Sequence, residues 1–92
     1  MTHLLCRNRV ADFANWKTIF ASHAAAHRNA GLELVRLWRQ MGQPNSVFFL
    51  FEVTNLEKAR EFISNPAAAE AAKTSGVLEG DYYFLEDAGG YA

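Results

Sequence analysis

The sequence predicts an α+β domain whose elements follow the order strand, helix, strand, strand, helix, strand. Three observations carry this prediction: a long amphipathic helix near the N-terminus, two apolar strands separated by a turn-forming segment, and a later helical region rich in alanine. A chain of 92 residues is long enough for one domain and too short for two. We therefore expect a single domain over residues 1–92, with a mobile glycine-containing tail over residues 87–92.

The first strand is predicted over residues 2–10, where apolar residues are interleaved with polar ones. Successive side chains of a strand point to opposite faces of the sheet, so Asn8 shares one face with Cys6. Arg7 lies on the other face, where we expect it to form a buried ion pair with Glu52 at a dimer interface; a functional site is the alternative.

Residues 12–31 are predicted to form one continuous helix, with Asp12 as its N-cap and Gly31 as the residue that ends it. At about 100° per residue, aromatic and histidine side chains gather on one face of this helix. The members of this face are Phe13, Trp16, Phe20, His23, Ala24 and His27. Histidines inside an aromatic face predict a polar spot on the wall of an otherwise apolar cavity.

The next segment, residues 32–53, predicts a β-hairpin because a Gly-Gln-Pro-Asn turn separates two apolar runs. If Met41 pairs with Ser46, then Arg36 and Trp38 lie on the face that the helices cover. The opposite face then carries Val35, Leu37, Phe48 and Leu50. At about 25 cal/mol per Å², covering such a face contributes several kcal/mol, so we expect a homodimer formed by two sheets packed face to face.

A capping box of Thr54 and Glu57 predicts the start of the second helical region. Asn65 and Pro66 restart the helix as a cap and a first helical residue, and an alanine-rich segment follows. Residues 81–86 predict the last strand. This order is that of the ferredoxin-like fold, with four antiparallel strands in the spatial order 4-1-3-2 and helices on one face.

The composition excludes several classes of protein. Nine basic and ten acidic residues are interspersed and give a net charge of −1, which is unlike the basic surface of a nucleic-acid-binding protein. No apolar run approaches the roughly 20 residues of a membrane helix, and the N-terminal segment lacks a secretory apolar core. A single cysteine, Cys6, fits a reducing compartment. We therefore expect a cytoplasmic protein that binds neither membranes nor nucleic acids.

The pattern FANWKTIFASHAAAHRNAGL, followed by a hairpin and VFFLFEVTNLEKAREF, resembles the dimeric α+β barrel superfamily. This group includes antibiotic-biosynthesis monooxygenases, stress-responsive barrel proteins and small cyclases, and the resemblance covers residues 4–86. It implies a small homodimeric protein, either a cofactor-independent oxygenase or a cyclase, with a small organic substrate between the first helix and the sheet. The alternative is a homodimer that binds a ligand or a partner and catalyses nothing.

The resemblance implies no cofactor. Haem-degrading members carry an asparagine on the first strand, which Asn8 matches by position, and a histidine on the second helix, which residues 56–75 lack. His23 and His27 have the i, i+4 spacing of two metal ligands, but no third ligand follows at a recognisable spacing. We therefore expect neither haem nor a metal ion.

The candidate site residues combine both lines of reasoning. We expect His23 and Asn8 to be catalytic, with His23 acting as a hydrogen-bonding or acid–base group. The expected substrate-binding residues are Trp16, His27, Arg36, Trp38 and Tyr82, with the choice between Tyr82 and Tyr83 left open. Structural histidines and a solvent-directed edge-strand arginine are the alternative interpretations.

Overall fold

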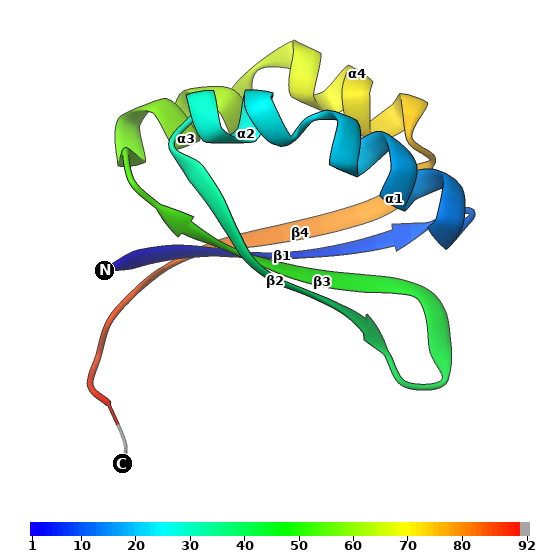
Figure 1. The fold of residues 1–92 in the computed structure, drawn as a ribbon, viewed down its shortest axis with the longest axis horizontal. Helices are drawn as coiled ribbons and strands as arrows, with labels where there is room; N and C mark the ends of the chain where they lie inside the picture. The colour runs from blue at the N-terminus through cyan, green and yellow to red at the C-terminus, as the bar shows by residue number, and fades with distance from the viewer. Residues whose placement is uncertain (91–92) are drawn as a thin grey trace.

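The computed structural model describes residues 1–90; residues 91 and 92, the end of the predicted tail, lie outside the described residues. Eight elements follow one another along the chain (Figure 1): β1 (Thr2–Val10), α1 (Phe13–Ser22), α2 (Ala24–Asn29), β2 (Leu32–Gln40), β3 (Gln43–Val53), α3 (Leu56–Ser64), α4 (Pro66–Thr74) and β4 (Val77–Glu86).

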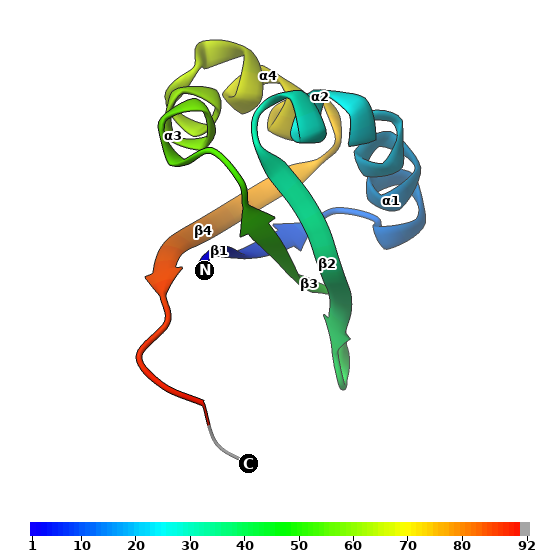
Figure 2. The same cartoon turned by 60° about the vertical axis from the view of Figure 1, so that its left-hand side comes forward.

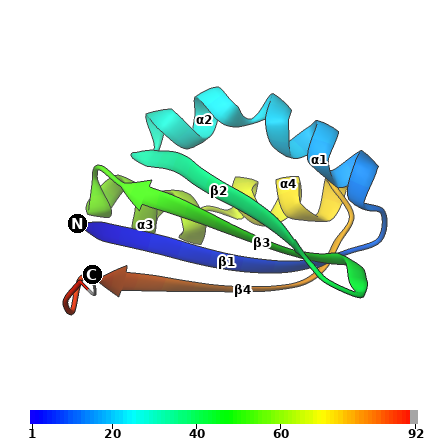
Figure 3. The ribbon, with the colours of Figure 1, turned by 60° about the horizontal axis from the view of Figure 1, so that its bottom comes forward.

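The four strands form one antiparallel sheet in the order β2-β3-β1-β4, which is the predicted order. All four helices lie over one face, which we call the inner face (Figures 1 and 2). Within residues 1–90, no helix covers the opposite, outer face (Figure 3). The ferredoxin-like prediction is therefore confirmed for the chain.

The predicted long helix is two helices that meet at His23. Asp12 caps α1 by accepting from the Asn15 N–H, as predicted. At the other end, the Ser22 hydroxyl donates to the Ile19 carbonyl. The His23 N–H, which in a continuous helix would donate to that same carbonyl, donates to the Phe20 carbonyl. Hydroxyl bonds of this kind compete with the helical ladder and bend helices. The prediction of one uninterrupted helix is therefore wrong at this point.

The second helical region also departs from the prediction in detail. Asn55, not Thr54, caps α3 by accepting from the Lys58 N–H. Asn65 caps α4 with Pro66 at its first position, as expected. The last strand is longer than residues 81–86, because β4 begins at Val77.

The predicted register of the hairpin is wrong by one residue. The turn is made by Met41 and Gly42, and Gln40 pairs with Gln43. Irregularities between Arg39 and Gln40, and again at Val35, shift the pairing along β2. Because side chains alternate along a strand, a one-residue shift exchanges the faces.

The exchange moves Arg36 and Trp38 to the outer face. Arg39 lies over the Phe13 ring of α1, with 4.1 Å between its guanidinium carbon and the ring centroid, and so belongs to the inner face. Leu37 packs against the core, which corrects its predicted outer position. Arg36 and Trp38 pair instead with Leu50 and Phe48, which do lie on the outer face.

The core lies between α1 and the centre of the sheet. Trp16 is 1% exposed and stacks on Phe20 with 4.7 Å between the ring centroids. The same indole contacts Phe49 of β3 at 5.7 Å. The core side chains exposed by 2% or less include Leu4, Val10, Trp16, Leu32, Val47 and Ala59. A stacked aromatic cluster thus fixes the first helix on the sheet.

Gly31, which follows α2, and Gly42, in the turn between β2 and β3, differ in how closely other residues approach them. Gly31 and Gly42 both have positive φ, +76° and +79°, where any other residue is strained. A Cβ on Gly31 would lie 2.9 Å from Asn55, whereas a Cβ on Gly42 meets nothing within 4 Å. We expect Gly42→Ala to cost about 1 kcal/mol and Gly31→Ala at least about 2 kcal/mol more. Urea unfolding of both variants checks this; equal losses would contradict it.

Candidate functional site

A cavity of about 500 Å³ lies between the helices and the inner face of the sheet. Strands β1, β3 and β4 form its floor, and residues from α1 to α4 form its walls and roof. Polar side chains among its lining residues include Asn8, Trp16, His23, His27, Lys73, Ser75 and Tyr82. The size is that of a site for a small organic molecule.

Aromatic side chains line one part of the cavity, and alanines line another. Aromatic rings from α1, α3 and β3 line one part: Trp16, Phe20, Phe49, Phe51 and Phe62. Alanines of α4 line another: Ala68, Ala69, Ala71 and Ala72. Small side chains on α4 leave open the space that larger ones would fill.

His27 is the imidazole that is embedded in the aromatic cluster. Its ring centroid lies 5.0 Å from Phe20, 5.3 Å from Phe51 and 5.8 Å from Phe62. Burial, with a smaller effect from His23, lowers the pKa of His27 to about 4. The side chain is therefore neutral at pH 7 and offers one hydrogen-bond donor and one acceptor.

His23 stands at the junction of α1 and α2, where it ends one helix and precedes the other. It is half-buried on the cavity wall, and its ring centroid lies 6.4 Å from that of His27. The two rings are nearly perpendicular, at 80°. The break in the helix thus places a second imidazole beside that of His27.

Asn8 and Tyr82 bring polar atoms to the floor of the cavity. Asn8 of β1 pairs with Gly80 of β4, and Tyr82 is two residues further along the same face. A Cβ built on Gly80 would lie 2.8 Å from the Asn8 side-chain oxygen, so the carboxamide lies against that glycine. Within residues 1–90, the described side-chain hydrogen bonds do not include one from this carboxamide to another protein group. The carboxamide is therefore the polar group of the floor that we consider for contact with a ligand.

Cys6 also lines the cavity. Burial raises the pKa of its thiol to about 12, so it stays protonated and is a poor nucleophile. Among the residues that the structure describes, no group of three or more His, Cys, Asp or Glu side chains is placed to hold a metal ion. The polar groups that we consider for chemistry in the cavity are the histidines, the amide and the aromatic hydroxyl.

Comparison with known proteins identifies the fold. No family model and no curated protein matches the sequence. Among solved structures, SnoaB from Streptomyces nogalater, described as a cofactor-independent oxygenase, superposes with a TM-score of 0.72 at 18% identity, over 97% of this chain and 94% of that one. A Bordetella bronchiseptica protein, provisionally named an antibiotic biosynthesis monooxygenase, gives 0.74 at 14% identity over 94% and 95% of the two chains.

The chain has the antibiotic biosynthesis monooxygenase-like fold. A NIPSNAP domain protein from Burkholderia xenovorans shares it as well, with a TM-score of 0.66, 15% identity, and coverage of 96% of this chain and 95% of that one. The predicted structural resemblance is thus confirmed. Identities this low establish the fold alone, so the site must be judged by its own residues.

Within this monooxygenase-like fold, the cavity gathers five of the seven predicted site residues: Asn8, Trp16, His23, His27 and Tyr82. The structure also decides between the two tyrosines. Tyr82 pairs with Cys6 on the inner face, whereas Tyr83 pairs with Leu5 on the outer face. Arg36 and Trp38 do not line the cavity, because the shifted register of β2 places them on the outer face. The prediction that they face the helices is wrong.

Sequence reasoning missed the contribution of α4. Ala68, Ala71, Ala72 and Ser75 have the i, i+3, i+4, i+7 spacing of one helix face, so the face itself was visible in the sequence. Alanine carries no chemistry, however, and the spacing does not indicate that this face borders a cavity instead of packing tightly. Within residues 1–90, no helix has the length and apolar character needed to cross a membrane.

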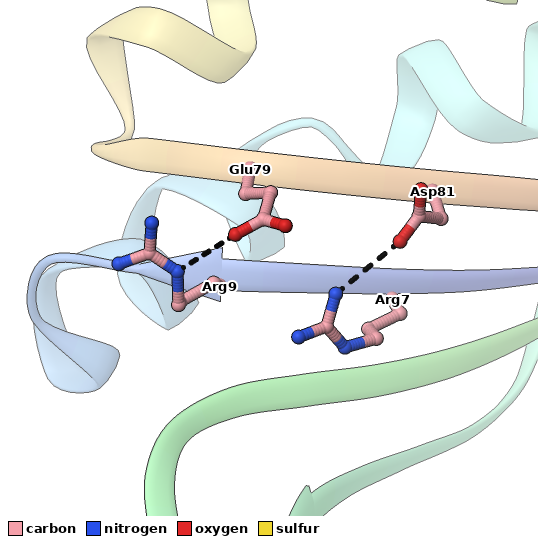
Figure 4. Close-up of polar contacts among 4 residues, drawn as sticks. All are labelled: Arg7, Arg9, Glu79 and Asp81. Atoms are coloured by element: carbon pink, nitrogen blue, oxygen red, sulfur yellow. Dashed lines mark hydrogen bonds and ion pairs between the residues drawn. The ribbon is translucent and has the colours of Figure 1, made fainter.

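Two ion pairs join β1 and β4 on the outer face of the sheet (Figure 4). Arg7 of β1 contacts Asp81 of β4 at 3.2 Å, and Arg9 contacts Glu79 at 3.0 Å. Within the chain, Arg7 therefore pairs with Asp81 and not with Glu52, which lies opposite His3 of β1; a pair of Arg7 and Glu52 across a dimer interface stays a prediction. These exposed pairs contribute little to stability, about 0–1 kcal/mol each.

The lowered pKa of His27 predicts a pH-dependent stability. The unfolded chain binds a proton near pH 6.5 and the folded one only near pH 4, so stability is complete above pH 6.5 and falls as the pH drops toward 4. Between pH 7.5 and 5.0 we expect wild type to lose about 2 kcal/mol more than His27→Gln. Urea unfolding at the two pH values measures this, with His3→Gln as control. Identical losses in wild type and His27→Gln would contradict the assignment.

Proposed function

We propose that the protein is a cofactor-independent oxygenase or cyclase acting on a small, electron-rich aromatic substrate in this cavity. The observation that carries the proposal is the cavity wall, where an aromatic surface, two histidines and an unpaired carboxamide face the same space. The fold shared with SnoaB supports the oxygenase form of the proposal. The buried free thiol of Cys6 supports the cytoplasm as its location.

In the oxygenase form, His23 removes a proton from a CH₂ group next to a phenolic or carbonyl-bearing ring. Histidine is the side chain that most often acts as a general base in enzymes, and it does so without a cofactor. The carbanion gives its electrons to dioxygen, a carbon–oxygen bond forms, and the resulting hydroperoxide loses water. The CH₂ group and O₂ thus become a carbonyl and H₂O, with no external reductant.

Three other groups hold the substrate during this step. The Asn8 carboxamide donates to the substrate oxygen on which negative charge develops, an interaction that strengthens toward the transition state. His27, with its pKa near 4, stays neutral and forms a hydrogen bond without adding charge to the site. Trp16 contributes to the aromatic surface of the cavity against which the substrate ring packs.

A binding function without catalysis is the second candidate. Within residues 1–90, neither histidine is hydrogen-bonded to a carboxylate that would orient it, as a general base often requires. A cavity of this kind retains a ligand by its aromatic surface alone. The two functions differ in whether bound substrate reacts.

Oxygen uptake in the presence of a hydroxylated anthrone separates them, because the CH₂ group of this compound is acidic and its carbanion reacts with O₂. We expect wild type to consume oxygen and His23→Ala to lower kcat/KM by about 100-fold or more. Ala72→Leu should raise KM strongly by filling the cavity, whereas Ala67→Leu, on the same helix but outside the lining, should not. Binding of the anthrone by wild type without oxygen uptake would leave only the binding function.

We also propose that two chains pair through their outer faces. One row of paired residues crosses the sheet as Arg36, Leu50, Leu5 and Tyr83, and the next begins with Trp38 and Phe48. Trp38 is 45% exposed and Tyr83 54%, which is unusual for large aromatic side chains of a monomer. Tryptophan, tyrosine and arginine are the residues that anchor protein interfaces. A second copy of the same apolar face is its simplest complement.

Replacing Leu50 by aspartate tests the dimer. An unpaired carboxylate buried between two sheets costs several kcal/mol, so Leu50→Asp should sediment as a monomer or aggregate. Leu56→Asp, at an exposed leucine of α3 on the helical side, should sediment like wild type. A wild-type mass of 10.3 kDa at micromolar concentration would refute the dimer.

A further inference from the structure

Gly80 occupies a position where a glycine needs an explanation. It lies inside β4, in a regular stretch where Arg7, Asn8 and Arg9 pair in turn with Asp81, Gly80 and Glu79. The irregularity between β1 and β4 falls later, after Arg9. Glycine weakens the interior of a strand, and it often marks a place where another group approaches the backbone closely.

The backbone at this position does not require glycine. The described glycines with positive φ are Gly31, Gly42, Gly76 and Gly89, and Gly80 is not among them. What an alanine would meet is Asn8. Its Cβ would lie 2.8 Å from the Asn8 side-chain oxygen, while the next atoms, the Arg7 carbonyl oxygen and Asn8 Cγ, are 3.7 and 3.8 Å away.

This contact involves the far end of a flexible side chain. Rotation of the carboxamide relieves it, so an added methyl group changes the direction of the Asn8 amide while the strand keeps its place. Asn8 and Gly80 both line the cavity. Because the Asn8 side-chain oxygen lies where an added Cβ would crowd it, the present orientation of this amide requires that residue 80 has no side chain.

We propose that Gly80 is a positioning residue. Because it has no side chain, the Asn8 oxygen can lie against the backbone of β4, and the carboxamide then points in the direction that contacts the substrate. The proposal rests on the proposed function for its effect on turnover. Its structural part, that residue 80 controls the Asn8 side chain, stands independently of any activity. The experiment therefore has one readout for each part.

The first readout is the pair of Asn8 side-chain NH₂ signals in a ¹⁵N–¹H NMR spectrum, assigned by their loss in Asn8→Ala. We expect Gly80→Ala to shift these signals while leaving the melting temperature unchanged or higher, since alanine suits a strand better than glycine. Gly90→Ala, where an added Cβ meets nothing within 4 Å, is the matched control. Unmoved Asn8 signals in Gly80→Ala would overturn the proposal.

The second readout is a mutant cycle on kcat/KM for the hydroxylated anthrone. Gly80→Ala should lower kcat/KM at least tenfold in the wild-type background and less than twofold in the Asn8→Ala background, because the effect passes through Asn8. Equal losses in both backgrounds would overturn the proposal, since Gly80 would then act on the cavity directly. Calorimetric titration with 1,8-dihydroxyanthraquinone, which does not react, measures binding separately.

These outcomes separate the two proposals. If wild type neither binds the anthraquinone nor consumes oxygen with the anthrone, the proposed function fails for this substrate class. The NMR comparison then still decides whether Gly80 controls Asn8. If wild type is active and the Asn8 signals move, but Gly80→Ala keeps full kcat/KM, the orientation of the amide does not matter to turnover and the positioning role is refuted.

Discussion

The packing of Trp16 between the first helix and the sheet is the interaction on which the rest of the structure depends. Its ring is almost completely buried and contacts both Phe20, on its own helix, and Phe49, on the central strand β3. Loss of so large a buried ring costs about 3–5 kcal/mol in other proteins, a large share of the stability of a small domain. The same ring forms part of the cavity wall. The protein thus uses one residue both to attach a helix and to shape its candidate site.

Helices α1 and α4 both line this cavity, but they do so with side chains of different size. The aromatic side chains of α1 reach the sheet and fill the space beneath them, whereas the alanines of α4 stop short of it. Protein interiors are normally packed without such gaps, because empty space forfeits contact energy. The space that these small side chains leave open is the feature on which the proposed ligand depends.

The sequence was sufficient for the element order, the sheet order and most of the cavity. Asn8, Trp16 and His27 were placed correctly because each lies on a regular strand or helix, where periodicity alone decides the face. Arg36 and Trp38 were misplaced because their face depends on the register of a hairpin. A two-residue turn and an irregularity at Val35 fix that register, and neither leaves a hydrophobic pattern in the sequence. The break at His23 depended similarly on one hydroxyl hydrogen bond.

The irregularity at Val35 has a consequence for the two tryptophans of the chain. Because β2 changes faces there, Trp38 lies on the outer face, while Trp16 lies beneath the helices on the inner one. A single sheet therefore separates two natural fluorophores, one that is 1% exposed and one that is 45% exposed in the single chain. Because indole emission shifts to longer wavelength in water, we expect the two to differ in emission wavelength. The protein thus carries separate optical signals for events on each side of its sheet, without any added label.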